Sequence, residues 1–125
     1  MKQFFLMIIL LGLTASTNSE EVLNSALQAG WKGNKVCELL FEDSKIRTLR
    51  CTFPPGVGHE KHYHPPHFGY ILKGGTMRIT DASGERVIGS AEDSGATWQS
   101  KGVAWHQALN IGSTTAQYLI IEQKY

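Results

Sequence analysis

The feature that most constrains the fold is a series of short apolar alternations, separated by turn residues, that begins after residue 35. Alternation with a period of two is typical of strands that bury one face. DASG at 81–84 and NIGST at 110–114 are turn segments, because Gly, Asn and Asp favour tight reversals. The sequence therefore predicts strands over residues 36–41, 46–53, 59–64, 67–73, 75–80, 85–89, 95–99, 103–109 and 115–122.

Many short strands in a chain of 125 residues predict one all-β domain, a sandwich or a closed barrel. A small jelly roll fits the length and leaves few strand edges exposed. Only SEEVLNSALQAG has helical character, and it predicts a short helix over residues 19–30 that ends at Gly30. We assign residues 20–35 to an N-terminal arm and residues 36–125 to the barrel.

The N-terminus has the pattern of a secretory signal peptide. Lys2 precedes the apolar run FFLMIILLGL at residues 4–13, and small polar residues follow it. A span of the hydrocarbon core needs about 20 apolar residues, and this run is much shorter. We expect residues 1–19 to be removed, with cleavage after Ser16 or Ser19, and the protein to be secreted or periplasmic. The alternative is a buried helix at the N-terminus.

The charge is balanced, with 12 Lys and Arg residues against 11 Asp and Glu residues and no clustering of either sign. Nucleic acids and anionic membranes both bind basic surfaces. We therefore expect no nucleic-acid partner, and no membrane partner after signal cleavage.

The two cysteines, Cys37 and Cys51, lie on the two strands of a predicted hairpin. A three-residue loop at 43–45 places Cys37 opposite Cys51 and Leu39 opposite Leu49. Cross-strand neighbours are close enough to bridge, and an exported protein permits a disulfide. The alternative is a pair of buried free thiols.

Four of the five histidines fall within HEKHYHPPH at residues 59–67. Alternation along a strand places His62 and His64 on one face together with Glu60, and His59 on the opposite face. Two prolines then turn the chain and bring His67 beside the pair. Imidazole is a common metal ligand, and His106 can complete the site from a later strand.

These segments resemble the two motifs of the cupin superfamily. In the first motif, Gly56 is followed by five residues and then by His62-Tyr63-His64, and FGYILKG resembles the strand that ends it. In the second, Gly102 is followed by three residues, His106, three more residues and Asn110. The resemblance covers residues 45–122 and implies a cupin jelly-roll β-barrel, also called a double-stranded β-helix, with a metal site. It also implies a homodimer.

The sequence departs from the motifs at three places. In the second motif, Ser100 replaces a proline and one extra residue precedes His106. In the first motif, two residues instead of three or four separate His64 from His67, and His67 stands where the superfamily usually has a glutamate. The resemblance therefore implies a variant with four histidine ligands, His62, His64, His67 and His106, or with three of them. Imidazoles leave the full charge on a divalent ion, and they suit Mn, Fe, Ni, Cu or Zn.

Four further residues are candidates for the pocket or for contacts to the ligands: Glu60, Tyr70, Arg78 and Trp98. Glu60 can accept a hydrogen bond from a ligating imidazole. Tyr70 and Trp98 can line the pocket mouth or simply pack in the barrel. Arg78 can anchor a carboxylate or lie on a solvated strand face.

Three classes of function remain open. The first is a metal-dependent oxidoreductase of the dioxygenase type, acting on a small compound that chelates the metal through oxygen. The second is a binding module that holds a metal or small ligand without turnover. The third is a metal-dependent isomerase or lyase.

Overall fold

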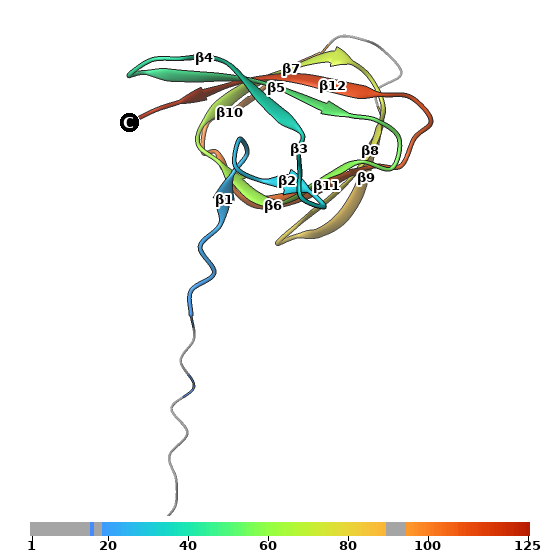
Figure 1. Cartoon of the computed structure of the whole chain (residues 1–125), viewed down its shortest axis with the longest axis horizontal. Helices are drawn as coiled ribbons and strands as arrows, with labels where there is room; N and C mark the ends of the chain where they lie inside the picture. Colours follow the sequence, from blue (N-terminus) through green and yellow to red (C-terminus); the bar gives the residue numbers. More distant parts are fainter. Residues whose placement is uncertain (1–15, 17–18, 90–94) are drawn as a thin grey trace, which may run out of the picture.

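The computed structural model describes residue 16 and residues 19–89 and 95–125, and it is built of strands (Figure 1). These are β1 (Asn24–Ser25), β2 (Gly30–Trp31), β3 (Asn34–Lys35), β4 (Cys37–Glu42), β5 (Ile46–Phe53), β6 (Gly58–His64), β7 (His67–Lys73), β8 (Thr76–Asp81), β9 (Gly84–Gly89), β10 (Ala96–Gln99), β11 (Val103–Asn110) and β12 (Ala116–Gln123). The nine strands that the sequence predicts are all present, each within one residue of its expected bounds.

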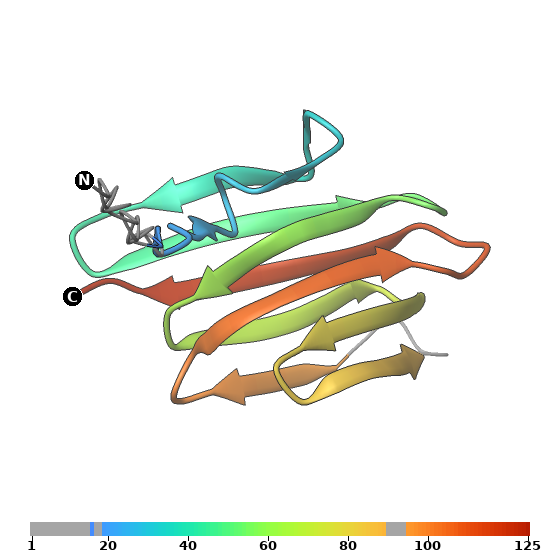
Figure 2. The ribbon, with the colours of Figure 1, turned by 90° about the horizontal axis from the view of Figure 1, so that it is seen from below.

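Two five-stranded sheets face each other (Figure 1). One has the order β1-β6-β11-β8-β9 and the other the order β10-β7-β12-β5-β4. The chain passes repeatedly from one sheet to the other, so strands that are neighbours in a sheet are often distant in the sequence. Figure 2 shows the β4–β5 hairpin at one side of the layered strands and the β8–β9 hairpin at the other. The all-β jelly-roll prediction is confirmed.

The predicted helix over residues 19–30 is wrong. Asn24 and Ser25 instead form a short parallel strand beside His62 and Tyr63 of β6. A single turn follows, in which the Ser25 carbonyl accepts hydrogen bonds from the amides of Gln28 and Ala29. Pairing with β6 and burial of Ala29 outweigh the local helical preference, which is a weak determinant by itself.

The hairpin of β4 and β5 has the expected register, with Cys37 opposite Cys51 and Leu39 opposite Leu49. Cys37 and Cys51 form a disulfide, and both side chains are buried. Leu49, Phe53 and Met77 pack in the same core cluster between the sheets. The disulfide therefore ties the edge strand β4 to the core.

The N-terminal segment is mostly outside this description. Residues 1–15 and 17–18, which carry most of the predicted signal peptide, lie outside the described residues. Within the described part of the chain, no helix has the length and apolar character to span a membrane.

Candidate metal centre

Strands β6 and β11 pair in antiparallel fashion, and two register shifts set which side chains face the interior. His62 pairs with His106, His59 with Ala108, and His64 with Val103. The interval from His59 to His62 on β6 is one residue longer than the facing interval on β11, so strict alternation is broken there. Both His59 and His62 are buried as a result, together with His64.

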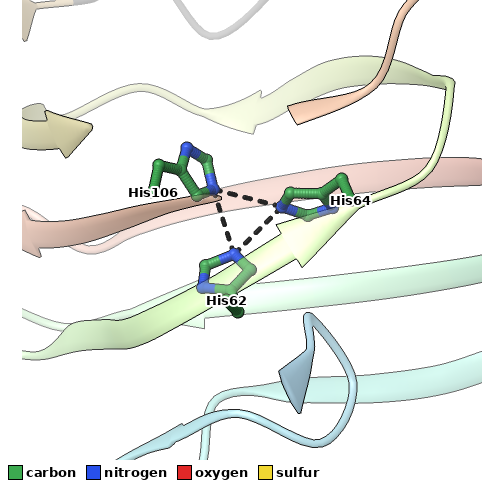
Figure 3. Close-up of side chains that lie close together, drawn as sticks. All are labelled: His62, His64 and His106. Atoms are coloured by element: carbon green, nitrogen blue, oxygen red, sulfur yellow. Dashed lines mark hydrogen bonds between the residues drawn. The ribbon is translucent and has the colours of Figure 1, made fainter. Parts of the chain in front are cut away.

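The imidazoles of His62, His64 and His106 converge on one point (Figure 3). The Nε2 atoms of His62 and His64 are 3.0 Å apart, those of His62 and His106 are 3.0 Å apart, and those of His64 and His106 are 3.2 Å apart. The first two residues come from alternating positions of β6, and the third comes from the neighbouring strand. The sheet pairing itself therefore builds the triangle.

Hydrogen bonds on the far side of two rings fix their tautomers. Nδ1 of His62 donates to the carbonyl oxygen of Glu60 at 2.6 Å. Nδ1 of His64 donates to a carboxylate oxygen of Glu122 at 2.9 Å. Because a carbonyl and a carboxylate accept, Nδ1 carries the proton in both rings, and both Nε2 lone pairs point into the triangle.

Burial keeps these imidazoles neutral. It lowers the pKa of His64 to about 2 and the pKa of His106 to about 3, mainly because a low-dielectric interior disfavours the charged form. Burial also lowers the pKa of His62. Neutral imidazole is the form that ligates metals, so the three rings are in the ligating state across the physiological pH range.

The triangle fits a divalent transition metal. With metal–nitrogen bonds of about 2.05 Å, adjacent ligand nitrogens lie about 2.9 Å apart at octahedral angles and about 3.3 Å apart at tetrahedral angles. The observed separations, 3.0 to 3.2 Å, fall between these values. Two inward lone pairs at 3.0 Å repel each other unless a cation or proton lies between them. The donor set and its geometry therefore suit an ion.

His67 lies next to this group without joining it. Its ring centroid is 4.6 Å from that of His64, and its Nδ1 donates to the carbonyl oxygen of Pro65 at 2.9 Å. The Pro65 carbonyl leaves Nε2 as the ring nitrogen with a free lone pair, as in His62 and His64. The structure thus brings together three of the four predicted ligands and places the fourth beside them.

His59 is on the interior side, which corrects the expectation that it faces the opposite way from the site. Its ring centroid is 3.7 Å from that of His62, and its Nε2–H donates a hydrogen bond to the carbonyl oxygen of Ala26 at 2.9 Å. The extra residue in β6 turns the side chain of His59 from the outer face to the interior. His59 is therefore a packing and hydrogen-bonding partner of the site.

Glu60 lies on the opposite side from the one expected. Its side chain is exposed, and its carboxylate accepts a hydrogen bond from the backbone amide of Lys32. The same register shift turns it outward. Glu60 still contacts the site, because its main-chain carbonyl orients His62.

The other three pocket candidates lie away from the cavity beside the histidines. Tyr70 and Trp98 are exposed, on strands β7 and β10. Arg78 lies 3.8 Å from Glu85 of the neighbouring strand β9, as a residue on an outer strand face does. None of the three lines the cavity.

Solved structures share the fold of this chain. The chain superposes on a cupin domain from Bordetella pertussis Tohama I with a TM-score of 0.64 and 18% identity, covering 72% of this chain and 93% of that one. An RmlC-like cupin with a double-stranded β-helix fold from Methanocaldococcus jannaschii gives 0.55 and 18%, covering 84% and 91%. The protein has a cupin fold. A predicted oxalate decarboxylase from Thermotoga maritima gives 0.51 and 18%, covering 71% and 79%.

Comparison by sequence identifies no relative. No protein-family profile matches the chain, and no curated protein matches it. The likeness to cupins therefore establishes the fold, and the chemistry of the site has to be argued from its own residues.

The cupin fold accommodates the departures from the cupin motifs. The extra residue before His106 is absorbed by the register shift between Val103 and His106. Gly102 has φ +69° and lies against the turn between β6 and β7, where a Cβ atom would come within 2.5 Å of the His64 carbonyl oxygen. Only glycine allows both this backbone conformation and this close approach.

Glu122 is a functional candidate that the sequence analysis missed. It is 1% exposed, and its second carboxylate oxygen is 4.0 Å from the guanidinium of Arg47. Burial raises its pKa, and Arg47 opposes this effect. The available signal was the alternation of β12, since Glu122 follows Tyr118 and Ile120 at inward positions.

We expect Glu122→Gln to weaken metal binding by about 10- to 100-fold, the usual effect of losing a carboxylate that supports a ligating histidine. The substitution removes the negative charge that polarises His64 but keeps a hydrogen-bond acceptor. Competition with a chelator measures the affinity. Glu42→Gln, an exposed carboxylate paired with Arg47, is the control and should keep the wild-type affinity. Equal affinities in both variants would contradict this role.

Proposed function

We propose that the protein binds one divalent transition metal through His62, His64 and His106 and uses it on a small molecule held in the adjacent cavity. The convergence of three neutral Nε2 atoms supports this proposal most directly. Three imidazole ligands leave coordination positions open on a four- or six-coordinate ion, as catalytic sites do. Mn, Fe, Ni, Cu and Zn all accept such ligands.

His67 is the proposed fourth ligand. Its Nδ1–H donates to the Pro65 carbonyl and its ring centroid is 4.6 Å from that of His64, so Nε2 is the nitrogen that it would offer to the ion. A fourth nitrogen would saturate a tetrahedral ion but leave two positions on an octahedral one. A site with four histidine ligands can therefore bind substrate only on a metal that accepts six ligands.

We expect His67→Ala to weaken metal binding and to lower the number of bound imidazoles from four to three, while the protein still binds one ion. Three converging ligands remain in this variant, so stoichiometry should survive. Pulsed electron paramagnetic resonance of the Cu(II)-loaded protein counts the imidazoles directly. An unchanged affinity and an unchanged imidazole count would show that His67 is not a ligand.

The proposed reaction is oxidation of a small compound that chelates the ion through oxygen. The ion would supply Lewis acidity, and with Fe, Mn or Cu it would supply redox chemistry. The three histidines would hold the ion. Glu122 orients the ring of His64, and the Glu60 carbonyl orients the ring of His62. The substrate would lie against the apolar lining of the cavity.

Oxygen uptake tests the proposed reaction. Protein loaded separately with Fe(II), Mn(II) or Cu(II) is mixed with diketones, catechols and flavonols, and the His106→Ala variant serves as the blank. Uptake that requires His106 supports an oxidoreductase. Ligand-dependent thermal stabilisation without uptake points to a binding module, and full turnover with Zn or Ni points to an isomerase or lyase.

Export and homodimer formation stay predictions. Cell fractionation and mass determination of the mature N-terminus test the first. Sedimentation equilibrium of the metal-loaded protein tests the second.

A further inference from the structure

The cavity beside the three converging imidazoles is small and apolar. It has a volume of about 170 Å³. Besides the histidines, its described lining consists of Cys51, Phe53, Met77, Ile79, Ile88, Ala108, Tyr118 and Ile120. Cys51 is in the disulfide, so Tyr118 provides the one hydroxyl group among these residues.

The volume sets the size of a ligand. A protein cavity of about 150 Å³ lined by aliphatic and aromatic side chains stays dry and binds benzene. At about 170 Å³, this cavity holds a body of similar or slightly larger size. A sugar ring with its hydroxyl groups would meet apolar carbon on most sides and would lose hydrogen bonds to water.

The lining also sets the charge of a ligand. Among the described lining residues there is no Lys, Arg, Asp or Glu. The guanidinium of Arg47 is paired with Glu42 at 2.9 Å and faces Glu122 rather than the cavity. A ligand can place anionic oxygens on the metal, but a charged group that stays inside the cavity without reaching the metal would have no partner among these residues, which is strongly unfavourable.

We infer that the site takes a molecule with oxygen atoms directed to the metal and an uncharged, apolar body of about the size of benzene. This substrate class rests on the proposed metal site. It disfavours ligands that bring a sugar ring, or a charged group that does not reach the metal, into the cavity.

The first test examines the cavity without metal. Toluene is titrated into the metal-free protein and followed by NMR chemical shifts. We expect saturable binding that weakens about tenfold or more in Ile120→Phe, because the larger ring fills the cavity. Leu119→Phe on the outer face of the same strand is the matched control and should bind as the wild type does. Ala108→Val repeats the test with a smaller change, should Ile120→Phe fold poorly.

The second test examines charge with the metal present. The zinc-loaded protein is titrated calorimetrically with 3-methylbutanohydroxamate and with malonic monohydroxamate. These ligands share one chelating head and are isosteric, but the second carries a carboxylate in place of an isopropyl group. We expect the apolar ligand to bind about 100-fold or more tightly, since the buried carboxylate has no partner.

The outcomes separate the two claims. Zinc binding with no toluene binding, or with malonic monohydroxamate binding as tightly as its apolar isostere, overturns the inferred substrate class and leaves the metal site standing. Toluene binding that Ile120→Phe abolishes, in a protein that binds no zinc, overturns the proposed metal site and supports the apolar cavity.

Discussion

The His106→Ala variant is expected to lose metal affinity by more than about 100-fold, beyond the loss that follows removal of a residue outside the ligand set. His106 supplies one of three Nε2 atoms that lie 3.0 to 3.2 Å apart. It is also the proposed ligand that joins β11 to the histidine pair of β6. Its removal breaks the triangle: only the two nitrogens of β6 still converge, and the proposed fourth ligand His67 lies beside them rather than across from them.

The measurement is competition against a chelator for Zn(II) and Co(II), with circular dichroism to check that each protein is folded. Gln107→Ala is the matched control, because Gln107 is the next residue on the same strand and its side chain is exposed. The control should bind metal as the wild type does. Wild-type affinity in His106→Ala would mean that β6 binds the ion without help from β11.

Reduction of the Cys37–Cys51 disulfide is expected to lower the free energy of unfolding by about 3 kcal/mol. The bridge joins residues separated by 14 positions, and closing a loop of about this size in the unfolded chain accounts for that amount. In the folded protein, the disulfide also holds strand β4 in place. β4 lies at the edge of its sheet, and Leu39, Leu40 and Phe41 are about half exposed, so this strand buries little apolar surface of its own.

Thermal unfolding of the metal-free protein with and without dithiothreitol measures the effect, since bound metal would add its own stabilisation. A loss of 3 kcal/mol lowers the melting temperature of a domain of this size by on the order of 15 °C. The double variant Cys37→Ala/Cys51→Ala is the control and should not respond to the reductant. An unchanged melting temperature of the reduced wild type would contradict the expected contribution.

The sequence predicted the strands well because their signals are local. Alternation and turn residues are read within a few positions, and all nine expected strands are found. The same logic failed at residues 19–30, where the deciding interaction is pairing of Asn24 and Ser25 with β6. That partner is about 40 residues away in the sequence, so the residues near Asn24 do not indicate the pairing.

At the site, the sequence predicted the facing of those side chains that follow the strand period of two. His62 and His64 follow the period of two, and they converge as expected. His59 and Glu60 do not follow it, because β6 contains one residue more than the facing part of β11 between His59 and His62. The side chain of His59 therefore faces the interior, and that of Glu60 faces solvent. Such a shift depends on the pairing of two strands, so one strand's sequence does not show it. Glu122 lies outside the motif segments, and only the alternation of β12 indicates its inward position.

The most direct test of the metal centre is anomalous X-ray diffraction from crystals of the zinc- or cobalt-loaded protein at the metal absorption edge. The account predicts one strong peak at about 2.0 to 2.1 Å from the Nε2 atoms of His62, His64 and His106. It also predicts that Nδ1 of His64 keeps its hydrogen bond to Glu122. A peak elsewhere on the protein, or none at the histidine triangle despite stoichiometric metal in the crystals, would contradict it.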